Sequence, residues 1–525
     1  MVIDKKYLTS IEITVNTECN FRCRLCTSAG MINGPVHEMK PDLFKKIVRE
    51  IDQKTLLHLV GGEPLLYFLD KQFLYDEIFK NPNIILQIVT NGSVIHKQNT
   101  LLRYLEQDKS CNIIFSGEAC HQGYENLRVG GDWNIFLSNI SLIVNLGKKN
   151  KNLIICINYI ATIQTMPYLK EFVEIMHNLG IHNIIVSNLF YSESAEKIYG
   201  INFNEHLITD IDTYKTEIKQ VISFMEENKY NTNFYAKHVK GETLLYEGNR
   251  EFLPIDNGHN AIKKLMTKEN LEIPCCWYPY YNLNILWDGT VSSCCASNNL
   301  TLGNCENNTI YEIFNNTKIS QMRDVVLSGK PPYCVCNNAL RTKGQIESVQ
   351  DVMRNFPLRA KYQEYIKQFQ AMKEQDVDKA IEFLEEKEKE TFDFDCFSSI
   401  IWNELAGVYL YRKKDYEKAE YYVNKILAIQ PHHIASLTKL ANILIFQKEY
   451  LKAIEKLNFL LEEKCEDPLV KFWLGYAYEL QGNKDKMYSL YRDFMFVCDN
   501  DKKYQHIVET WGYSHAQEVM NNENK

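Results

Sequence analysis

Three cysteines near the start of the chain have the spacing of metal-cluster ligands. Cys19, Cys23 and Cys26 form a CxxxCxxC loop directly after the strand-like run at 11–15. Such a loop offers three thiolates to one cubane iron-sulfur cluster and leaves the fourth iron without a protein ligand. That open iron can bind a further molecule and deliver one electron to it. A zinc ion is the alternative occupant, because thiolates bind zinc as well.

A glycine-rich segment, Gly61-Gly62-Glu63-Pro64, follows the next strand-like run at 56–60. The cysteine loop and this segment together resemble the radical S-adenosylmethionine (SAM) enzymes. The resemblance implies that SAM chelates the open iron of a 4Fe-4S cluster and is split reductively to methionine and a 5'-deoxyadenosyl radical. That radical abstracts hydrogen from an unreactive carbon of the substrate. The resemblance disfavours zinc, although Leu25 stands where the family usually has an aromatic residue.

The same resemblance implies further contacts to SAM. Gly61, Gly62 and Glu63 would line the methionyl amino group, where glycine lets the backbone approach closely. Thr90-Asn91-Gly92 resembles a recurrent strand-end element, for which an ordinary turn is the alternative. Ser116 and Arg128 look like contacts to the SAM carboxylate and ribose, and a surface salt bridge is the alternative for the arginine. The expected cofactor-binding residues are therefore Gly61, Gly62, Glu63, Asn91, Ser116 and Arg128, with Asn158 as a weaker candidate.

A second group of cysteines lies between positions 275 and 336. The run at 281–291 predicts a β-hairpin with Asp288-Gly289 in its turn, which would hold cysteines on facing strands. This region resembles the SPASM module, or its shorter twitch form, and the cysteine count fits one auxiliary 4Fe-4S cluster. The preferred ligands are Cys276, Cys294, Cys334 and Cys336. Cys275, Cys295 and Cys305 stay open as alternative ligands, and a zinc ribbon is the alternative for the whole module.

Six β-rich runs that alternate with helix-length segments must position these motifs. They lie at 11–15, 56–60, 84–89, 112–115, 153–160 and 183–186. This alternation predicts parallel βα units, and the family resemblance implies a partial (β/α)6 TIM-like barrel. In such barrels the loops after the strands carry the chemistry, and each motif above follows a strand.

The C-terminal region predicts long amphipathic helices that repeat at an interval of 34 residues. Ala419, Ala453 and Met487 occupy one repeat position, and Leu440 and Leu474 occupy another. Leu405 precedes Leu440 by 35 residues, which one extra residue in the turn at 411–416 would explain. The pattern resembles tetratricopeptide repeats, which commonly bind peptides or partner proteins. A rigid spacer or dimerisation arm is the alternative.

The length of 525 residues predicts several domains. We expect an α/β radical SAM core barrel at 1–200, a bridging helical segment at 201–270, a small α+β SPASM/twitch 4Fe-4S domain at 271–345 and all-α helical repeats at 346–525. The net charge of -8 argues against general nucleic-acid binding. Sixteen cysteines without an export signal favour metal ligation over disulfides in a cytoplasmic protein. No apolar run is long enough to cross a membrane.

We therefore expect a radical SAM enzyme of oxidoreductase type, served by an external electron donor of the flavodoxin or ferredoxin kind. The favoured substrate is a peptide or protein side chain that is crosslinked, oxidised or epimerised, with the repeats holding the substrate. The alternative is a sugar or amino sugar dehydrogenase or epimerase whose repeats dock a partner. A non-catalytic scaffold is the least favoured reading. No residue stands out as catalytic acid or base, and the polar candidates near the motifs are Glu118, His121, Tyr278 and Asp288.

Overall fold

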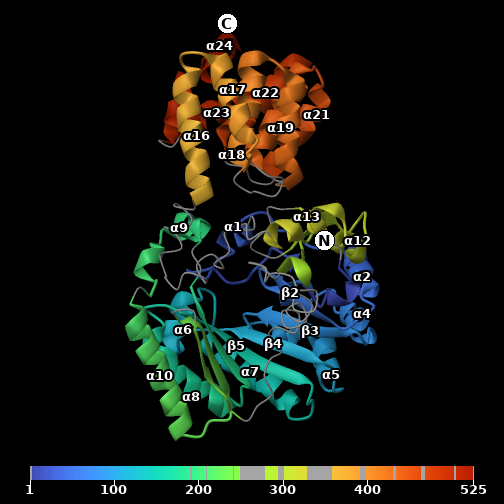
Figure 1. Ribbon diagram of the computed structural model, residues 1–525, viewed down its shortest axis with the longest axis vertical. Coiled ribbons are helices and arrows are strands. Elements are labelled where there is room, and N and C mark those ends of the chain that lie inside the picture. Colours follow the sequence, from blue (N-terminus) through green and yellow to red (C-terminus); the bar gives the residue numbers. More distant parts are fainter. Residues whose placement is uncertain are drawn as a thin grey trace. The chain divides into compact units, whose positions relative to one another are not determined.

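The chain forms two compact units, Met1–Phe356 and Pro357–Lys525, which are described separately below. The computed structural model describes residues 3–189, 192–208, 210–239, 242–248, 278–293, 301–327, 357–390, 398–429, 433–462, 467–501 and 504–523 (Figure 1). Among these residues, no helix combines the length and apolar character that a membrane crossing requires.

The first unit is built on a sheet whose strand order is β11-β10-β9-β1-β2-β3-β4-β5-β6-β7-β8. The strands are β1 (Ser10–Asn16), β2 (Thr55–Gly61), β3 (Ile84–Thr90), β4 (Cys111–Ser116), β5 (Leu153–Ala161), β6 (Asn183–Asn188), β7 (Asn233–Val239), β8 (Glu242–Tyr246), β9 (Asn282–Ile285), β10 (Thr290–Ser292) and β11 (Gly303–Asn304). Strands β1 to β7 pair in parallel, so the predicted α/β core with a partial barrel is confirmed.

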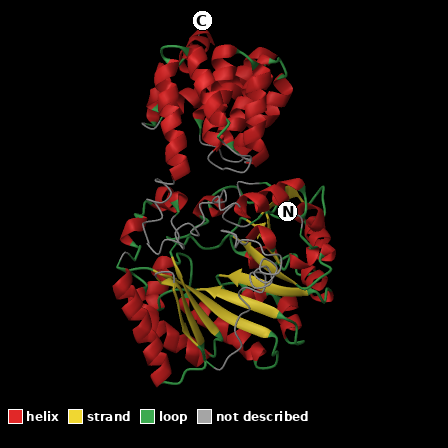
Figure 2. Cartoon of the chain, viewed as in Figure 1, coloured by secondary structure: helices red, strands yellow, loops and turns green. Residues whose placement is uncertain are grey.

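Helices connect these strands and cover the sheet, as the alternating sequence pattern predicted (Figure 2). They are α1 (Ala29–Ile32), α2 (Pro41–Glu50), α3 (Pro64–Tyr67), α4 (Leu74–Lys80), α5 (Asn99–Leu105), α6 (His121–Leu127), α7 (Trp133–Gly147), α8 (Leu169–Leu179), α9 (Glu193–Tyr199), α10 (Ile211–Glu227), α12 (Ile310–Phe314) and α13 (Thr317–Leu327). Helix α2 illustrates why these segments form helices that pack on the sheet. Proline occupies its first turn, and Leu43, Phe44 and Ile47 form a buried apolar stripe.

Residues 201–270 contribute more than the helical bridge that the sequence indicated. Helix α10 matches the helical pattern that was expected, but β7 follows it and pairs in parallel with β6. Strand β8 then pairs antiparallel with β7 at the edge of the sheet. The run Asn233–Val239 mixes polar and apolar residues without strict alternation, which is why a period-two search does not find it.

The predicted hairpin is confirmed, and it belongs to the same sheet as the core. Strands β9 and β10 are antiparallel, and Gly289 in the turn has a φ of +82°, which favours glycine. Strand β9 also pairs in parallel with β1, with Ile11 opposite Leu283. The strand that precedes the first cysteine loop is therefore hydrogen-bonded directly to the hairpin of the second cysteine region.

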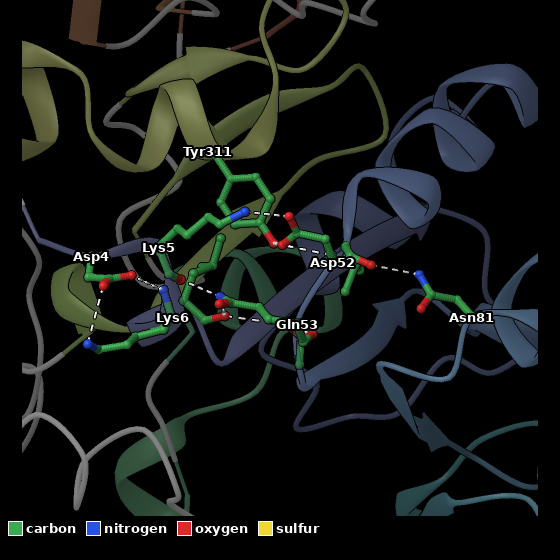
Figure 3. A network of polar contacts seen from close by, with 10 residues as sticks. Asp4, Lys5, Lys6, Asp52, Gln53, Asn81 and Tyr311 are labelled. Atoms are coloured by element: carbon green, nitrogen blue, oxygen red, sulfur yellow. Dashed lines mark hydrogen bonds and ion pairs between the residues drawn. The ribbon is translucent and has the colours of Figure 1, made fainter.

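Polar contacts join helix α12 to the start of the chain and to the turn between α2 and β2 (Figure 3). The Tyr311 hydroxyl donates to Asp52 Oδ1 at 2.7 Å, and Lys5 forms an ion pair with the same carboxylate. Gln53 Nε2 donates to the Leu8 carbonyl at 3.0 Å. These contacts hold the region after the hairpin against the core, although exposed ion pairs add little stability on their own.

The second unit consists of helices that pack against one another in sequential pairs. They are α16 (Pro357–Lys373), α17 (Val377–Glu388), α18 (Ser398–Val408), α19 (Tyr416–Ile429), α20 (Ile434–Phe446), α21 (Tyr450–Glu462), α22 (Pro468–Gln481), α23 (Lys484–Asn500) and α24 (Trp511–Glu523). A π-helical turn, Tyr409–Lys413, continues α18. Such a turn inserts one residue into a helix, which accounts for the interval of 35 residues. The helical architecture is as expected, and the tetratricopeptide assignment stays a prediction.

Candidate active site

The first cysteine loop is fixed between β1 and α1 by backbone contacts to a distant segment. Arg22 N donates to the Val129 carbonyl at 2.8 Å, and Arg24 N donates to the Leu127 carbonyl at 3.0 Å. The loop therefore pairs with the backbone on either side of Arg128. This pairing brings the predicted cluster ligands and the predicted SAM-binding arginine to one place.

The glycine-rich segment after β2 lies in direct backbone contact with the same loop. Gly62 N donates to the Asn16 carbonyl at 3.2 Å, and Glu63 N donates to the Glu18 carbonyl at 2.7 Å. A Cβ atom on Gly62 would lie 2.1 Å from the Glu18 carbonyl oxygen. Glycine is required here because any side chain would push the two segments apart next to Cys19.

We expect Gly62→Ala to lose most of its N-terminal cluster, because its methyl group displaces the backbone that carries Cys19. The measurement is iron and sulfide per chain after anaerobic reconstitution, together with the yield of 5'-deoxyadenosine. Gly147→Ala is the control, since its Cβ would meet nothing closer than the flexible Ile155 Cδ1 at 3.3 Å. Equal iron content in the two variants would contradict this account of Gly62.

Glu63 is buried and connects the segment after β2 to the end of β3. Its carboxylate accepts from Thr90 Oγ1 at 2.7 Å, from Asn91 N at 2.7 Å and from Leu65 N at 3.1 Å. Desolvation raises the pKa of Glu63 to about 7, and these three donors act in the opposite direction. Both carboxylate oxygens are thus engaged by the protein, so the side chain positions the strand ends.

Asn91 connects the end of β3 to the cysteine loop. Its Nδ2 donates to Asn20 Oδ1 at 3.0 Å and lies 4.0 Å from the Cys19 sulfur, while its Oδ1 accepts from Ser93 N at 2.9 Å. The predicted strand-end element therefore contacts the first cluster ligand. Asn91 therefore takes part in a turn, through Ser93, and also contacts the cysteine loop, through Asn20.

Arg128 is buried in the site and pairs with Glu118 from the loop after β4. Its Nη2 donates to Glu118 Oε2 at 2.7 Å, and its Nη1 lies 4.0 Å from the Cys23 sulfur. Its Nε is buried and has no hydrogen-bond acceptor among the described residues. Burial alone would lower the pKa of Arg128, but the Glu118 carboxylate and the Cys23 sulfur raise it above its ordinary value. The surface salt bridge considered for Arg128 is not what the geometry shows.

The loop that carries Glu118 is strained. Ala119 has a φ of +62°, a left-handed conformation that costs a residue with a Cβ about 1–2 kcal/mol. Such strain persists where surrounding contacts enforce it, often at functional sites.

Ser116, at the end of β4, is half-buried and makes no hydrogen bond through its hydroxyl within the described part of the chain. Asn158 Oδ1, on β5, accepts from Ser187 Oγ at 3.0 Å.

The three thiols lie in a setting that suits cluster ligands. Desolvation raises the pKa of Cys19 to about 11, that of Cys23 to about 12 and that of Cys26 above its ordinary value. Partly buried thiols of this kind ionise when a metal replaces the proton. N–H donors point at the sulfurs, including Phe21 N to Cys19 at 3.4 Å, and such hydrogen bonds stabilise cluster thiolates. The donor set therefore fits a 4Fe-4S cluster.

The contacts above connect the cysteine loop with the glycine-rich segment, Asn91 and Arg128, and Ser116 is the last residue of β4. The preferred ligands of the auxiliary cluster lie outside the described residues. They are Cys276, Cys294, Cys334 and Cys336, together with the alternatives Cys275 and Cys295. Cys305 is described and is 1% exposed. Sequence reasoning missed Asn16, whose Nδ2 donates to the Glu63 carbonyl at 3.1 Å. Its place at the end of β1 was the available signal.

Comparisons with known proteins agree with this geometry. Residues 13–174 match the Radical SAM superfamily model, and residues 275–338 match SPASM, an iron-sulfur cluster-binding domain. No curated protein matches the chain.

Two solved structures are similar to part of the chain. Streptococcus suis SuiB is 17% identical, with a TM-score of 0.49 over 66% of this chain and 77% of that chain. The enzyme anSMEcpe, solved with AdoMet and a Cp18Cys peptide, is 17% identical, with a TM-score of 0.41 over 60% of this chain and 81% of that chain.

Proposed function

Because this chain is a radical SAM enzyme with an iron-sulfur cluster-binding SPASM domain, we propose that it abstracts hydrogen from a side chain of a peptide or protein. The cofactors are 4Fe-4S clusters and SAM. The product would be a crosslinked, oxidised or epimerised peptide. The domains that we assign are the core at 1–200, a connecting region at 201–270, the auxiliary domain at 271–345 and the repeats at 346–525.

When bound, the N-terminal cluster and SAM supply the electron transfer and the 5'-deoxyadenosyl radical. Cys19, Cys23 and Cys26 would hold three irons, and the backbone at 61–63 would border the methionyl group. The free Nε of Arg128 and the Ser116 hydroxyl would bind the SAM carboxylate and ribose, because both are polar groups without partners in the described site. Glu63 and Asn91 would hold these segments in place relative to one another.

The auxiliary cluster would lie beside the hairpin, with Cys276, Cys294, Cys334 and Cys336 as its ligands. The pairing of β9 with β1 supports a fixed path between the two cluster regions. Held by these ligands, the cluster would supply one-electron redox chemistry, which suits an oxidation or the formation of a new bond. An external flavodoxin- or ferredoxin-type donor would reduce the N-terminal cluster.

The peptide assignment depends on the second unit. Its helices form sequential pairs in a compact unit of their own, Pro357–Lys525. Arrays of helix pairs present extended surfaces suited to binding peptides. A small sugar would require no such surface for recognition.

The direct test is to co-express the chain with short peptides encoded beside its gene and to analyse them by mass spectrometry. Loss of two hydrogen atoms, or deuterium uptake at an α-carbon in heavy water, would support the proposal. If no peptide changes mass or takes up deuterium, while an amino sugar stimulates 5'-deoxyadenosine formation, the peptide assignment is wrong.

Metal content gives an independent prediction. Anaerobically reconstituted protein should contain about eight irons and about eight sulfides per chain, because two 4Fe-4S clusters are expected. The measurement combines colorimetric iron and sulfide assays with electron paramagnetic resonance of the reduced protein. A content of about four irons, with a single cluster signal, would show that the protein binds one 4Fe-4S cluster and has no auxiliary cluster.

A further inference from the structure

Polar side chains form a row across six neighbouring strands of the sheet, from β10 through β9 and β1 to β4. Each member lies directly opposite the next in the strand pairing. We call this set the interior row, and its members are Ser292, Asn284, Glu12, His58, Gln87 and Asn112. Barrel interiors are normally filled by bulky, branched apolar side chains. A polar row at this position therefore points to a role other than packing.

The strand pairing shows that the row faces the inside of the partial barrel. On β4, the Phe115 ring packs against Phe136 of α7, so Phe115 points to the face that the helices cover. Asn112 precedes Phe115 by three residues and therefore lies on the opposite, inner face. It lies directly opposite Ile154, which belongs to an apolar cluster on that face. Because residues that are opposite each other in a sheet share a face, the rest of the row faces inward too.

The two ends of the row are neutral pairs. Asn284 Nδ2 donates to Ser292 Oγ at 3.1 Å, and Asn112 Nδ2 donates to Gln87 Oε1 at 3.4 Å. The pair between them holds the titratable groups of the row.

This central pair consists of Glu12 on β1 and His58 on β2, with Glu12 Oε2 3.1 Å from His58 Nδ1. A carboxylate only accepts hydrogen bonds, so the hydrogen of the neutral imidazole lies on Nδ1 and its Nε2 is an acceptor. His58 Nε2 is buried and has no hydrogen-bond partner in the described part of the chain. A buried acceptor without a donor costs free energy, which a donor on a bound molecule would recover.

The inner face is less closely packed at this level than the face under the helices. The side chains of His58 and Glu12 are 20% and 17% exposed. Their neighbours along the strands, Ile11, Ile13 and Leu57, are fully buried on the other face. The edge of the imidazole is therefore within reach of a molecule that enters the barrel.

The position of His58 restricts what such a molecule can be. His58 precedes Gly61 by three residues, so it lies about 10 Å deeper than the segment proposed to border SAM. Val60 and Val89 are half-buried, inward-facing residues between the two levels. An ammonium group would lose its hydration between these valines, whereas a neutral donor on an apolar side chain loses much less. A long, apolar side chain with a neutral donor near its end describes tyrosine and tryptophan.

We propose that His58 Nε2, oriented by Glu12, accepts a hydrogen bond from a tyrosine or tryptophan side chain that enters the barrel. The phenol O–H or the indole N–H is the donor, and the ring lies against the valines above His58. This proposal rests on the proposed function, since it names the side-chain class of the peptide that the enzyme recognises.

The test measures how small aromatic probes bind to the reconstituted full-length chain, by saturation-transfer NMR. p-Cresol and 3-methylindole carry the two donors, and toluene and 1,3-dimethylindole are their counterparts without a donor. Wild-type protein should bind each donor probe more tightly than its counterpart. His58→Phe should weaken both donor probes about fivefold, the effect of one hydrogen bond, and leave the counterparts within about twofold of wild type.

His177→Phe is the matched control and should keep the wild-type preference. His177 is a half-buried histidine of α8 whose Nδ1 is 3.2 Å from Thr232 Oγ1. Glu12→Gln is a second test variant. It retains the imidazole but no longer fixes the hydrogen on Nδ1, so it should also reduce the preference for donor probes.

Circular dichroism and iron content establish whether each variant folds and binds its clusters. The proposal is overturned if wild-type protein shows no preference for the donor probes, or if folded His58→Phe retains that preference. Should His58→Phe not fold, an undiminished preference in Glu12→Gln overturns the proposal.

Probe binding does not depend on turnover, so the result is distinguishable from failure of the proposed function. If the donor probes bind through His58 but no peptide is modified, the peptide-modification proposal fails and the site in the barrel stands. If a peptide is modified while probe binding is independent of His58, the function stands and this inference fails.

Discussion

Replacing Cys23 with alanine should abolish SAM cleavage, with a loss of at least about a thousandfold in 5'-deoxyadenosine formation, equivalent to about 4 kcal/mol in activation free energy. Cys23 lies on the loop paired with residues 127–129, and Arg128 Nη1 is 4.0 Å from its sulfur. Without this thiolate the loop can supply only two of the three ligands that the cluster requires. The measurement is chromatographic quantification of 5'-deoxyadenosine from anaerobic protein, SAM and a strong reductant.

The matched control for this loss is Cys498→Ala. Cys498 is a fully buried thiol in α23 of the second unit, whereas Cys23 is only partly buried. Its removal should leave both the iron content and SAM cleavage near wild-type values. Iron should fall by about half in Cys23→Ala, since one of two clusters is lost. Undiminished 5'-deoxyadenosine from Cys23→Ala would exclude this loop as the site of SAM cleavage.

Local patterns in the sequence were sufficient to predict the strands of the core. Apolar runs such as 11–15 and 56–60 became β1 and β2 because residues such as Ile11, Ile13 and Leu57 are fully buried. The hairpin turn was predictable because Asp288-Gly289 combines a side-chain acceptor with a glycine at positive φ. In these cases the determinants lie within a few neighbouring residues.

Contacts between distant residues were not predictable in the same way. The resemblance placed Glu63 in the segment beside SAM, but no local pattern indicated that its carboxylate would accept three hydrogen bonds from Leu65, Thr90 and Asn91. The pairing of β9 with β1 joins residues about 270 positions apart, and no sequence periodicity encodes such a pairing. Similarly, the sequence indicated Glu118 only as a polar residue near a motif. Its ion pair with Arg128 forms because α6, which lies between the two residues in the chain, brings Arg128 next to Glu118.

The pair of Arg128 and Glu118 should be the strongest polar determinant of stability in the first site. The two side chains are only 9% and 11% exposed, and the N–O distance is 2.7 Å. Arg128→Met leaves the Glu118 carboxylate buried without its cation, which typically costs about 3–5 kcal/mol. We also expect SAM affinity to fall at least about tenfold, since the arginine would contribute a charge-assisted hydrogen bond to the SAM carboxylate.

Arg49→Met provides a matched control for this prediction. Arg49 and Glu77 form an arginine–glutamate pair of similar geometry, with an N–O distance of 2.9 Å, but the arginine is 64% exposed. Its removal should cost no more than about 1 kcal/mol, because water solvates the remaining carboxylate. Urea titration of both variants and equilibrium SAM binding are the measurements. If the two variants lose equal unfolding free energy and bind SAM equally well, the burial of Arg128 contributes neither to stability nor to the site. If Arg128→Met loses stability but binds SAM normally, the arginine positions the cysteine loop without contacting SAM.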